Sequence, residues 1–380
     1  MKVECSGRRL YELASYASSK STTLSITDYL TLYSSDGKAY LKSNGLDYQF
    51  SAVLGLVEGE GKMFVPIRKL KNFLRYEKES IVIESLGKTV KLSSNKRGQC
   101  NVSWYIPEMA EVPSPSTIGH VFRVDGEFMR RLGMATIYAD DGNASRPILE
   151  TVNIKQGDGH IKMASADGFR LFNASFPELS VAELAGGINI PASFCRLMAR
   201  VFKNGCWIGF SEPKLLDSTF KTYTDSKVWF ENDGLKFISS TCSGTFPKYE
   251  SLIPTVEAIW KFTCSAPLLQ TRCRQIDKDS YIVRLTSENE QQLKIVSDST
   301  GKLGVPTDDS YFIALIPATI ERKGEFFDVR IALNSKYLID TLAHFSEVTF
   351  EVISTSQPVK IYGDLKNVLA VIMPMFIQWD

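Results

Sequence analysis

The side chains best placed to do chemistry in this sequence are cations that recur with helical spacing. In each of two segments, 66–77 and 191–203, three basic residues stand three or four positions apart, which puts them on one face of a helix. Apolar residues at the intervening positions form a separate stripe that would face a core. The two basic stripes consist of Arg68, Lys71, Arg75, Arg196, Arg200 and Lys203.

Other predicted helices carry fewer cations, but they also lean basic. These further candidates are Arg8, Arg9, Lys20, Arg130, Arg131, Arg272, Arg274 and Lys336. Basic helices that lack a base-reading motif are suited to phosphate contacts, which give salt-dependent binding without sequence preference. The sequence therefore indicates a surface that contacts phosphates. For any single helix, an ordinary solvated charged face is the competing interpretation.

Motifs for enzyme chemistry are missing from the sequence. There is no phosphate-binding loop, no dinucleotide fingerprint, no zinc-protease motif and no nucleophile elbow. The seven cysteines contain no C-x-x-C pair, and the three histidines are too few for a metal site or a proton relay. Pairs of acids at 140–141 and 308–309 are typical of loops. We therefore predict no catalytic residue, no cofactor and no metal, and expect a protein that is not an enzyme.

Composition describes an ordinary globular chain. Its 380 residues include 44 Lys and Arg against 43 Asp and Glu, a net charge of +1, so only the distribution of charge is informative. No stretch approaches the roughly 20 apolar residues that span a bilayer, and the scattered cysteines suit a reducing compartment. We expect a cytoplasmic location.

A helix-start pattern that returns along the chain predicts a repeated architecture. Pro66 and Pro191 are each expected at the first position of a helix, and Asn334 with Ser335 would cap a third. Most of the remaining sequence reads as short strands separated by turn residues. Helices are predicted near 7–19, 66–77, 125–138, 191–203, 266–276 and 334–345.

Two proline-containing segments, 107–115 and 246–254, read as linkers between units of similar size. They divide the chain into an N-terminal domain over 1–118, a central domain over 119–255 and a C-terminal domain over 256–380. The fold class predicted from these elements is α+β, with two helices packed on antiparallel sheets in each domain.

Several motifs, in order along the chain, resemble the bacterial sliding clamp, the β subunit of the replicative DNA polymerase. Residues 164–171 are similar to the family's V-A-T-D-G-H-R-L turn, and 246–254 to its F-P-D-Y-x-x-x-x-P connector. The stretch 371–375 is similar to its V-V-M-P-M ending. Residues 146–149 resemble R-x-x-L, and 334–338 resemble N-x-x-Y-L.

The resemblance implies three similar domains and a homodimer that closes head to tail into a ring around duplex DNA. Helices would line the hole and sheets would form the outside, so the protein would act as a processivity factor held on DNA by topology. In the first domain, a basic edge at Lys91, Lys96 and Arg97 could face acids of the third domain such as Asp298, Asp308 or Asp309.

The resemblance also implies a hydrophobic pocket between the second and third domains. There the replicative polymerase, the clamp loader and repair factors would dock a short linear motif. The walls carried over from the motifs are Leu149, Ala166, Gly168, Phe169, Arg170, Leu171, Pro247, Leu252, Asn334, Tyr337, Val371, Ile372, Met373, Pro374 and Met375. Plain core packing is the competing interpretation for each of them.

Departures from the family motifs point to a more apolar pocket. Phe169 replaces the family's histidine, Ser251 replaces a common arginine, and Phe376-Ile377 replaces the Arg-Leu of the ending. The appended Trp379 could partly cover the pocket. We therefore expect an altered motif preference.

Two other functions remain open from the sequence alone. The first is a β-rich, non-enzymatic binding protein whose basic helices are merely solvated. The second is an enzyme with a site that no motif reveals.

Overall fold

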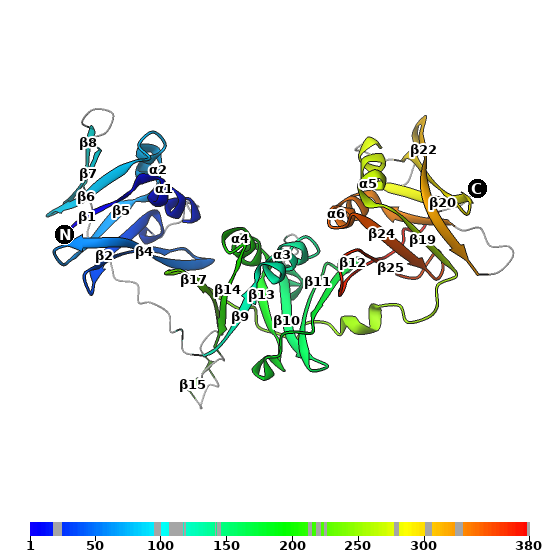
Figure 1. Ribbon diagram of the computed structural model, residues 1–380, viewed down its shortest axis with the longest axis horizontal. Coiled ribbons are helices and arrows are strands. Elements are labelled where there is room, and N and C mark those ends of the chain that lie inside the picture. The colour runs from blue at the N-terminus through cyan, green and yellow to red at the C-terminus, as the bar shows by residue number, and fades with distance from the viewer. Residues whose placement is uncertain are drawn as a thin grey trace. The chain divides into compact units, whose positions relative to one another are not determined.

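The chain folds into two compact units, as seen in a computed structural model (Figure 1). The first comprises Met1–Gly126 with Phe202–Thr241, and the second Glu127–Val201 with Cys242–Asp380. The structure describes residues 1–17, 25–94, 100–105, 117, 119–140, 142, 146–211, 215–217, 222–223, 226–276, 281–300, 306–323 and 330–377.

One order of elements, strand–helix–four strands–helix–three strands, occurs three times. The first copy is β1 (Lys2–Ser6), α1 (Gly7–Tyr16), β2 (Tyr29–Ser35), β3 (Lys38–Asn44), β4 (Tyr48–Glu58), β5 (Lys62–Pro66), α2 (Ile67–Leu74), β6 (Ser80–Leu86), β7 (Thr89–Ser94) and β8 (Cys100–Tyr105). The second is β9 (His120–Asp125), α3 (Gly126–Ala135), β10 (Thr151–Gly157), β11 (His160–Ala166), β12 (Arg170–Phe176), β13 (Ile188–Pro191), α4 (Ala192–Val201), β14 (Gly205–Phe210), β17 (Lys227–Asn232) and β18 (Leu235–Ser240). The third is β19 (Trp260–Ser265), α5 (Ala266–Gln275), β20 (Ile282–Asn289), β21 (Gln292–Thr300), β22 (Pro306–Arg322), β23 (Arg330–Asn334), α6 (Ser335–Leu342), β24 (Glu347–Val352), β25 (Val359–Gly363) and β26 (Val368–Ile372).

Short elements supplement this order. The second copy carries an additional pair, β15 (Leu215–Asp217) and β16 (Thr222–Tyr223), between β14 and β17. Four 3₁₀ turns are described: η1 (Ser25–Asp28), η2 (Pro147–Glu150), η3 (Ala182–Leu184) and η4 (Tyr249–Leu252). The threefold order agrees with the predicted α+β class of three similar domains. The predicted boundaries fall between β8 and β9 and between η4 and β19, and their positions stay a prediction.

Each of the six described α-helices starts directly after a strand. Pro66 and Pro191, predicted at the first helical position, are instead the last residues of β5 and β13, and Pro66 is the N-cap of α2. Proline fits there because its fixed φ, −69° at Pro66, also suits extended backbone. The predicted cap at Asn334 is confirmed, since its Oδ1 accepts from the backbone N–H of Lys336 and Tyr337.

Each unit contains one continuous twelve-stranded antiparallel sheet, and the strands of the second copy are divided between the two. In the first unit the order runs β8-β7-β6-β1-β4-β18-β17-β14-β9, with β3, β2 and β5 branching from β4. In the second it runs β13-β10-β11-β12-β26-β25-β24-β19-β22-β21-β20-β23. The copies are therefore joined through β4·β18 in one sheet and β12·β26 in the other.

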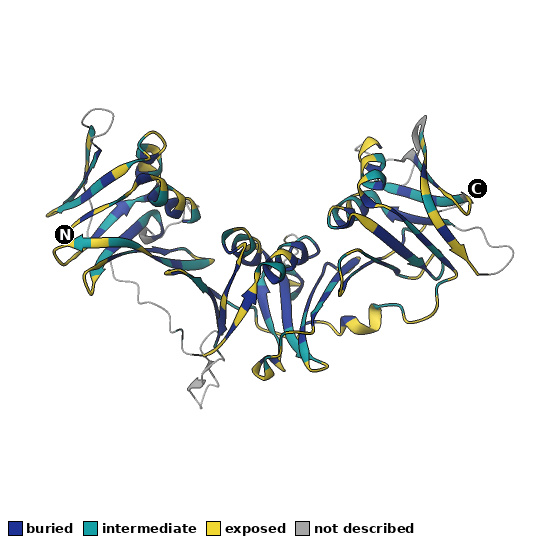
Figure 2. Ribbon diagram, viewed as in Figure 1, coloured by how far each residue is buried: buried dark blue, intermediate teal, exposed yellow. Residues whose placement is uncertain are grey.

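The helices pack in pairs with their apolar sides buried (Figure 2). Contacts join α1 to α2, and Gln270 of α5 donates from Nε2 to the carbonyl of Ile339 in α6. Leu70 and Met198 are fully buried, as the apolar stripes predicted. Among the described residues, no helix is long and apolar enough to cross a membrane.

Gly7, the first residue of α1, lies close to the chain that follows α2. Its N–H donates to the carbonyl oxygen of Glu79 at 2.5 Å. A Cβ at this position would lie 2.6 Å from the carbonyl oxygen of Glu77. The second copy repeats this arrangement, because a Cβ on Gly126 would lie 2.6 Å from the carbonyl oxygen of Lys203. In the first and second copies, the missing side chain lets the segment after the second helix approach the start of the first helix, whereas the third copy has Ala266 at this position.

We expect Gly7→Ala to lower the free energy of unfolding by about 1–3 kcal/mol, because backbone atoms cannot move aside cheaply. Thermal denaturation followed by circular dichroism measures this change. Gly186→Ala is the matched control, since nothing lies within 4 Å of a Cβ built there. Equal melting temperatures for the two variants would contradict the close-approach argument.

Candidate DNA surface and partner site

The helix pair α1–α2 of the first unit presents exposed cations. Arg8, Arg68 and Arg75 are exposed and form no ion pair with another described residue. Arg9 pairs with Glu12 at 2.9 Å, and the half-buried Lys71 donates to the carbonyl of Ala17. Burial also lowers the pKa of Lys71. Three exposed arginines on one helix pair give this surface available positive charge.

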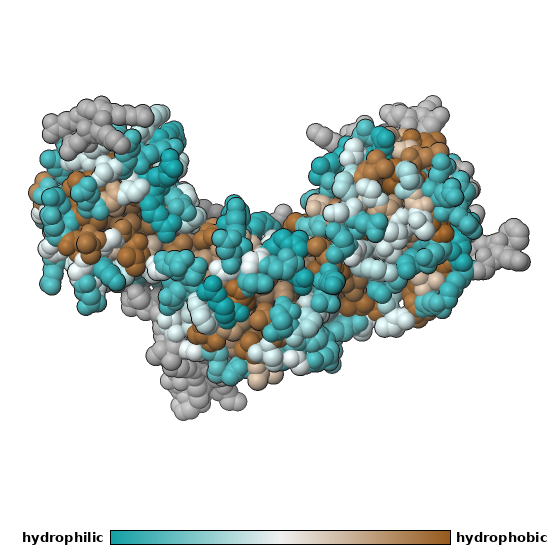
Figure 3. Space-filling view, in the orientation of Figure 1, coloured by the Kyte–Doolittle hydropathy of each residue, from teal (hydrophilic) through white to brown (hydrophobic). Residues whose placement is uncertain are grey.

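Helices α3–α6 of the second unit carry a second set of cations. Arg200, Arg274 and Lys336 are exposed and make no ion pair with a described residue. The exposed Arg196 donates to the carbonyl oxygen of Thr136 at 3.1 Å, and Arg130 pairs with Glu127 at 2.7 Å. Arg272 is half-buried and donates to Gln275. Lys203, just beyond α4, is exposed, and Lys20 lies outside the described residues. The surface over α1 to α4 is predominantly hydrophilic (Figure 3).

The prediction that Arg131 contacts phosphates is wrong. Only 11% of its side chain is exposed, and it donates to Glu127 at 2.8 Å and to the carbonyl of Ser175 at 3.1 Å. Its guanidinium also lies 5.1 Å from the ring centroid of Phe176. These contacts join α3 to β12, so Arg131 is a structural residue that offers no charge to a ligand.

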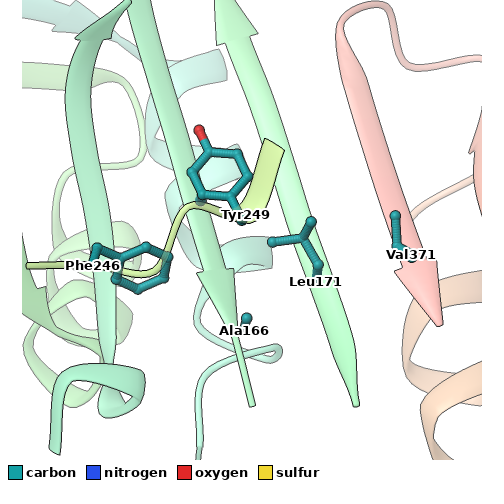
Figure 4. Close-up of a cluster of buried hydrophobic side chains, with 6 residues drawn as sticks. Ala166, Leu171, Phe246, Tyr249 and Val371 are labelled. Atoms are coloured by element: carbon teal, nitrogen blue, oxygen red, sulfur yellow. The ribbon is translucent and has the colours of Figure 1, made fainter. Parts of the chain in front are cut away.

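A buried apolar cluster forms where the connector at 246–254 crosses the second unit's sheet. Ala166 ends β11, Leu171 lies in β12 and Val371 in β26, while Phe246 and Tyr249 come from the connector (Figure 4). Leu171 and Val371 are direct cross-strand partners. Ala164, Ile148 and Ile253 complete the cluster. Three predicted pocket residues are thus brought together.

Exposed apolar side chains lie on the segments that form this cluster: the β11–β12 turn, the connector and the chain after β26. Phe169 is 60% exposed, Leu252 54%, Met373 37% and Phe376 87%. The N–H of Met373 donates to the carbonyl oxygen of Phe169 at 2.8 Å, which sets these two residues side by side. We call Phe169, Leu252, Met373 and Phe376 the apolar rim. Exposed apolar groups that lie side by side, as Phe169 and Met373 do, are typical of binding surfaces.

The connector is fastened to β10 by Lys155. Its ammonium pairs with Glu250 and lies 4.8 Å from the ring centroid of Tyr249. Burial raises the pKa of Tyr249. Phe246 and Tyr249 were missing from the predicted pocket, although their motif was recognised. The sequence did contain a signal for them, because two aromatic residues three positions apart in a connector are candidates for burial against the sheet that it crosses.

The remaining predicted pocket residues divide into supporting and accessible groups. Leu149, Arg170, Ile372 and Pro374 are buried, so they are placed to hold the accessible residues in position and not to contact a partner themselves. The ring of Tyr337 packs on the guanidinium of Arg170, whose central carbon lies 4.3 Å from the ring centroid. Asn334 caps α6. Met375 donates to the carbonyl of Ala332, and Pro247 is exposed. Gly168 has φ of +97°, which glycine tolerates best. Trp379 lies outside the described residues.

No metal site emerges from the described residues: they contain no group of three or more His, Cys, Asp or Glu side chains that could hold an ion.

Comparisons with known proteins point to one family, although no protein-family model matches the chain. The beta sliding clamp of Halalkalibacterium halodurans is 25% identical over 229 residues, which cover 59% of this chain and 55% of that relative. The matched region thus spans only about half the length of the curated relative.

Solved structures match over nearly the whole chain. A sliding clamp (DNA polymerase III subunit beta) from Bartonella birtlesii, crystallised bound to griselimycin, has a TM-score of 0.82 at 19% identity and covers 99% of this chain and 100% of its own. The DNA polymerase III subunit beta from Pseudomonas aeruginosa gives a TM-score of 0.80 at 16% identity, with 99% and 100% covered. The resemblance to bacterial β sliding clamps is therefore confirmed, and this chain has the sliding-clamp fold.

Proposed function

We propose that this chain is a DNA sliding clamp, a non-catalytic processivity factor that encircles duplex DNA and tethers a polymerase. The match of its whole fold to sliding clamps carries the proposal. Helices α1 to α6 would face the DNA, with exposed residues such as Arg68, Arg200 and Lys336 near phosphates. Such contacts carry no sequence information, so the ring can slide. A cytoplasmic location is part of this proposal.

Ring closure would use a strand pairing that the chain already makes twice. In β4, one edge pairs with β3 and the other with β18, the last strand of the next repeat. In β12, one edge pairs with β11 and the other with β26, again the last strand of the next repeat. The third equivalent pair would join β22 to the last strand of a first repeat, β8.

The free edges fit this third pairing. Ala318 and Ile320 of β22 donate toward the β21 side, while β19 pairs with residues 318–322 on the opposite edge. On the β19 side, the described residues 312–317 have no strand partner, and β8 is the last strand of its sheet. Because β8 and β22 are different surfaces, the interface is heterologous and closes a head-to-tail dimer only if its rotation permits.

In this proposal, pairing of β8 with β22 is the main dimer contact, in place of the charge pairs between the first and third domains that were expected from the sequence. Lys91 is half-exposed in β7, whereas Lys96 and Arg97 lie outside the described residues. The side chains of Asp298, Asp308 and Asp309 are also outside the described part.

The apolar rim is the proposed docking site for a short linear motif of the replicative polymerase, the clamp loader and repair factors. Its four side chains offer no charge, which favours apolar and aromatic residues in the motif.

Charge reversal of the helices tests the clamp function. In the triple variant Arg68→Glu, Arg200→Glu, Arg274→Glu, which changes exposed residues without a described ion pair, we expect loss of DNA-dependent stimulation of the replicative polymerase with an unchanged melting temperature. The salt slope of DNA binding should also fall, by about one for each phosphate that the variant no longer neutralises. The control reverses three exposed cations on strands, Lys38, Lys62 and Arg123. Equal loss of stimulation in both variants would contradict a DNA role for the helices.

Interface variants test the dimer. Ile313 and Leu315 of β22 are each 51% exposed and lie on the same face of the strand, and neighbouring exposed apolar side chains suit an interface. We expect Ile313→Asp with Leu315→Asp to convert dimer to monomer in sedimentation-velocity runs. Leu46→Asp with Val256→Asp is the control, at apolar positions 64% and 68% exposed outside β8 and β22. A dimer that survives the β22 changes would refute this pairing.

A rim variant tests docking. Met373→Glu should weaken binding of a fluorescein-labelled peptide carrying the clamp-binding motif of a bacterial replicative polymerase, by about tenfold or more for a charge placed at an apolar contact. Fluorescence anisotropy measures the affinity, with Val256→Glu as the exposed apolar control. Unchanged affinity for Met373→Glu would place docking elsewhere.

A further inference from the structure

Arg170 is a buried cation at the start of β12 with only 7% of its side chain exposed. Its Nε donates to Asp167 Oδ2 at 2.9 Å, its Nη1 to Asp340 Oδ2 at 2.9 Å, and its Nη2 to the carbonyl oxygen of Ile137 at 2.7 Å. The guanidinium carbon also lies 4.3 Å from the ring centroid of Tyr337 and 5.3 Å from that of Tyr138. One side chain thus joins the β11–β12 turn, the segment after α3 and helix α6.

The turn that carries Phe169 depends on the same carboxylate. Asp167 Oδ1 accepts from the N–H of Phe169 at 2.9 Å and from that of Arg170 at 3.0 Å, while Oδ2 accepts from the guanidinium. The carbonyl of Phe169 in turn accepts from Met373. Holding Asp167 in place therefore fixes two members of the apolar rim relative to each other.

Charge makes this arrangement sensitive to the guanidinium. The side chains of Asp167 and Asp340 are only 10% and 28% exposed, and Arg170 bonds both. Without it, two poorly solvated carboxylates would face one another without a cation, and one or both would have to turn toward water. Movement of Asp167 would release the two N–H groups of the turn.

We propose that Arg170 is a positioning residue of the partner site, which orders the β11–β12 turn so that Phe169 stands beside Met373 before a partner arrives. This role rests on the proposed docking function. Arg170 makes its contacts within the protein and leaves partner contact to the apolar rim. A surface ordered in advance binds more tightly, because binding then costs less conformational entropy.

Arg170→Lys is the principal test, since lysine keeps the charge but cannot form the forked set of bonds. The probe is the labelled polymerase-motif peptide. We expect about tenfold weaker binding, the order of magnitude for a loop that must become ordered on binding. Hydrogen–deuterium exchange should show faster exchange of the Phe169 amide. Asp340→Asn removes the negative charge of Asp340 but keeps the size of its side chain. It should also weaken peptide binding and speed exchange of the Phe169 amide, but less than Arg170→Lys does.

Thr341→Val is the matched control within the same buried layer. It removes the hydrogen bond from the Tyr138 hydroxyl to Thr341 Oγ1 at 2.9 Å but leaves the turn's own bonds in place. We expect a lower melting temperature with peptide affinity and turn exchange unchanged. Weakening of affinity in Thr341→Val equal to that in Arg170→Lys would overturn the positioning role, as would wild-type exchange at Phe169 in Arg170→Lys.

The outcome for the wild type separates this inference from the docking function. If the wild type does not bind the peptide, the docking function fails, and the partner-site role of Arg170 fails with it. If the wild type binds and Arg170→Lys binds equally well, docking stands and only the positioning role is overturned.

Discussion

Backbone pairing at strand edges is the constraint on which this structure depends. A strand edge exposes N–H and C=O groups that must be bonded or kept from unwanted pairing. Here β4 bonds β18 and β12 bonds β26, so each repeat closes an edge of the repeat before it. Of the edges equivalent to these, those of β22 and β8 have no strand partner among the described residues of the same chain. In the proposed dimer, a second copy supplies both, so ring formation continues the chain's own internal pairing.

The same pairing determines what the site contains. Because β26 lies beside β12 in register, Val371 stands opposite Leu171 and Ile372 opposite Arg170. The next residue, Met373, then reaches the carbonyl of Phe169. Residues far apart in sequence thus form one apolar surface as a direct result of strand register. Neither this register nor the three bonds of the Arg170 guanidinium leaves a local pattern in the sequence. Resemblance to the family motifs supplied the positions, whereas burial decides which of them support a site and which remain available to a partner.

The sequence predicted the helices well, because amphipathic periodicity and caps such as Asn334 are local properties. It misjudged Arg131, although the information was present: Phe128 and Ala135, three before and four after it, are both buried positions of α3. A residue at that spacing shares their face. We grouped Arg131 with its neighbour Arg130, which does lie on the exposed side of α3, and so overlooked this spacing. The division of the second repeat's strands between two sheets could not be predicted, because strand partners are chosen by long-range packing.

The two proposed binding surfaces use charge in opposite ways, and solvent exposure explains the difference. Exposed cations such as Arg200 and Lys336 are hydrated, so each contributes little energy and none fixes a geometry. Their summed interaction with phosphates can nevertheless be substantial through counterion release, and it is the same at every position along a duplex. Arg170 is shielded from water and bonds two carboxylates, where electrostatic interactions are stronger and depend on geometry. The proposed function, sliding along DNA while a partner peptide is held in one pose, would require both kinds of interaction, and the exposed helix cations and the buried Arg170 would supply one each.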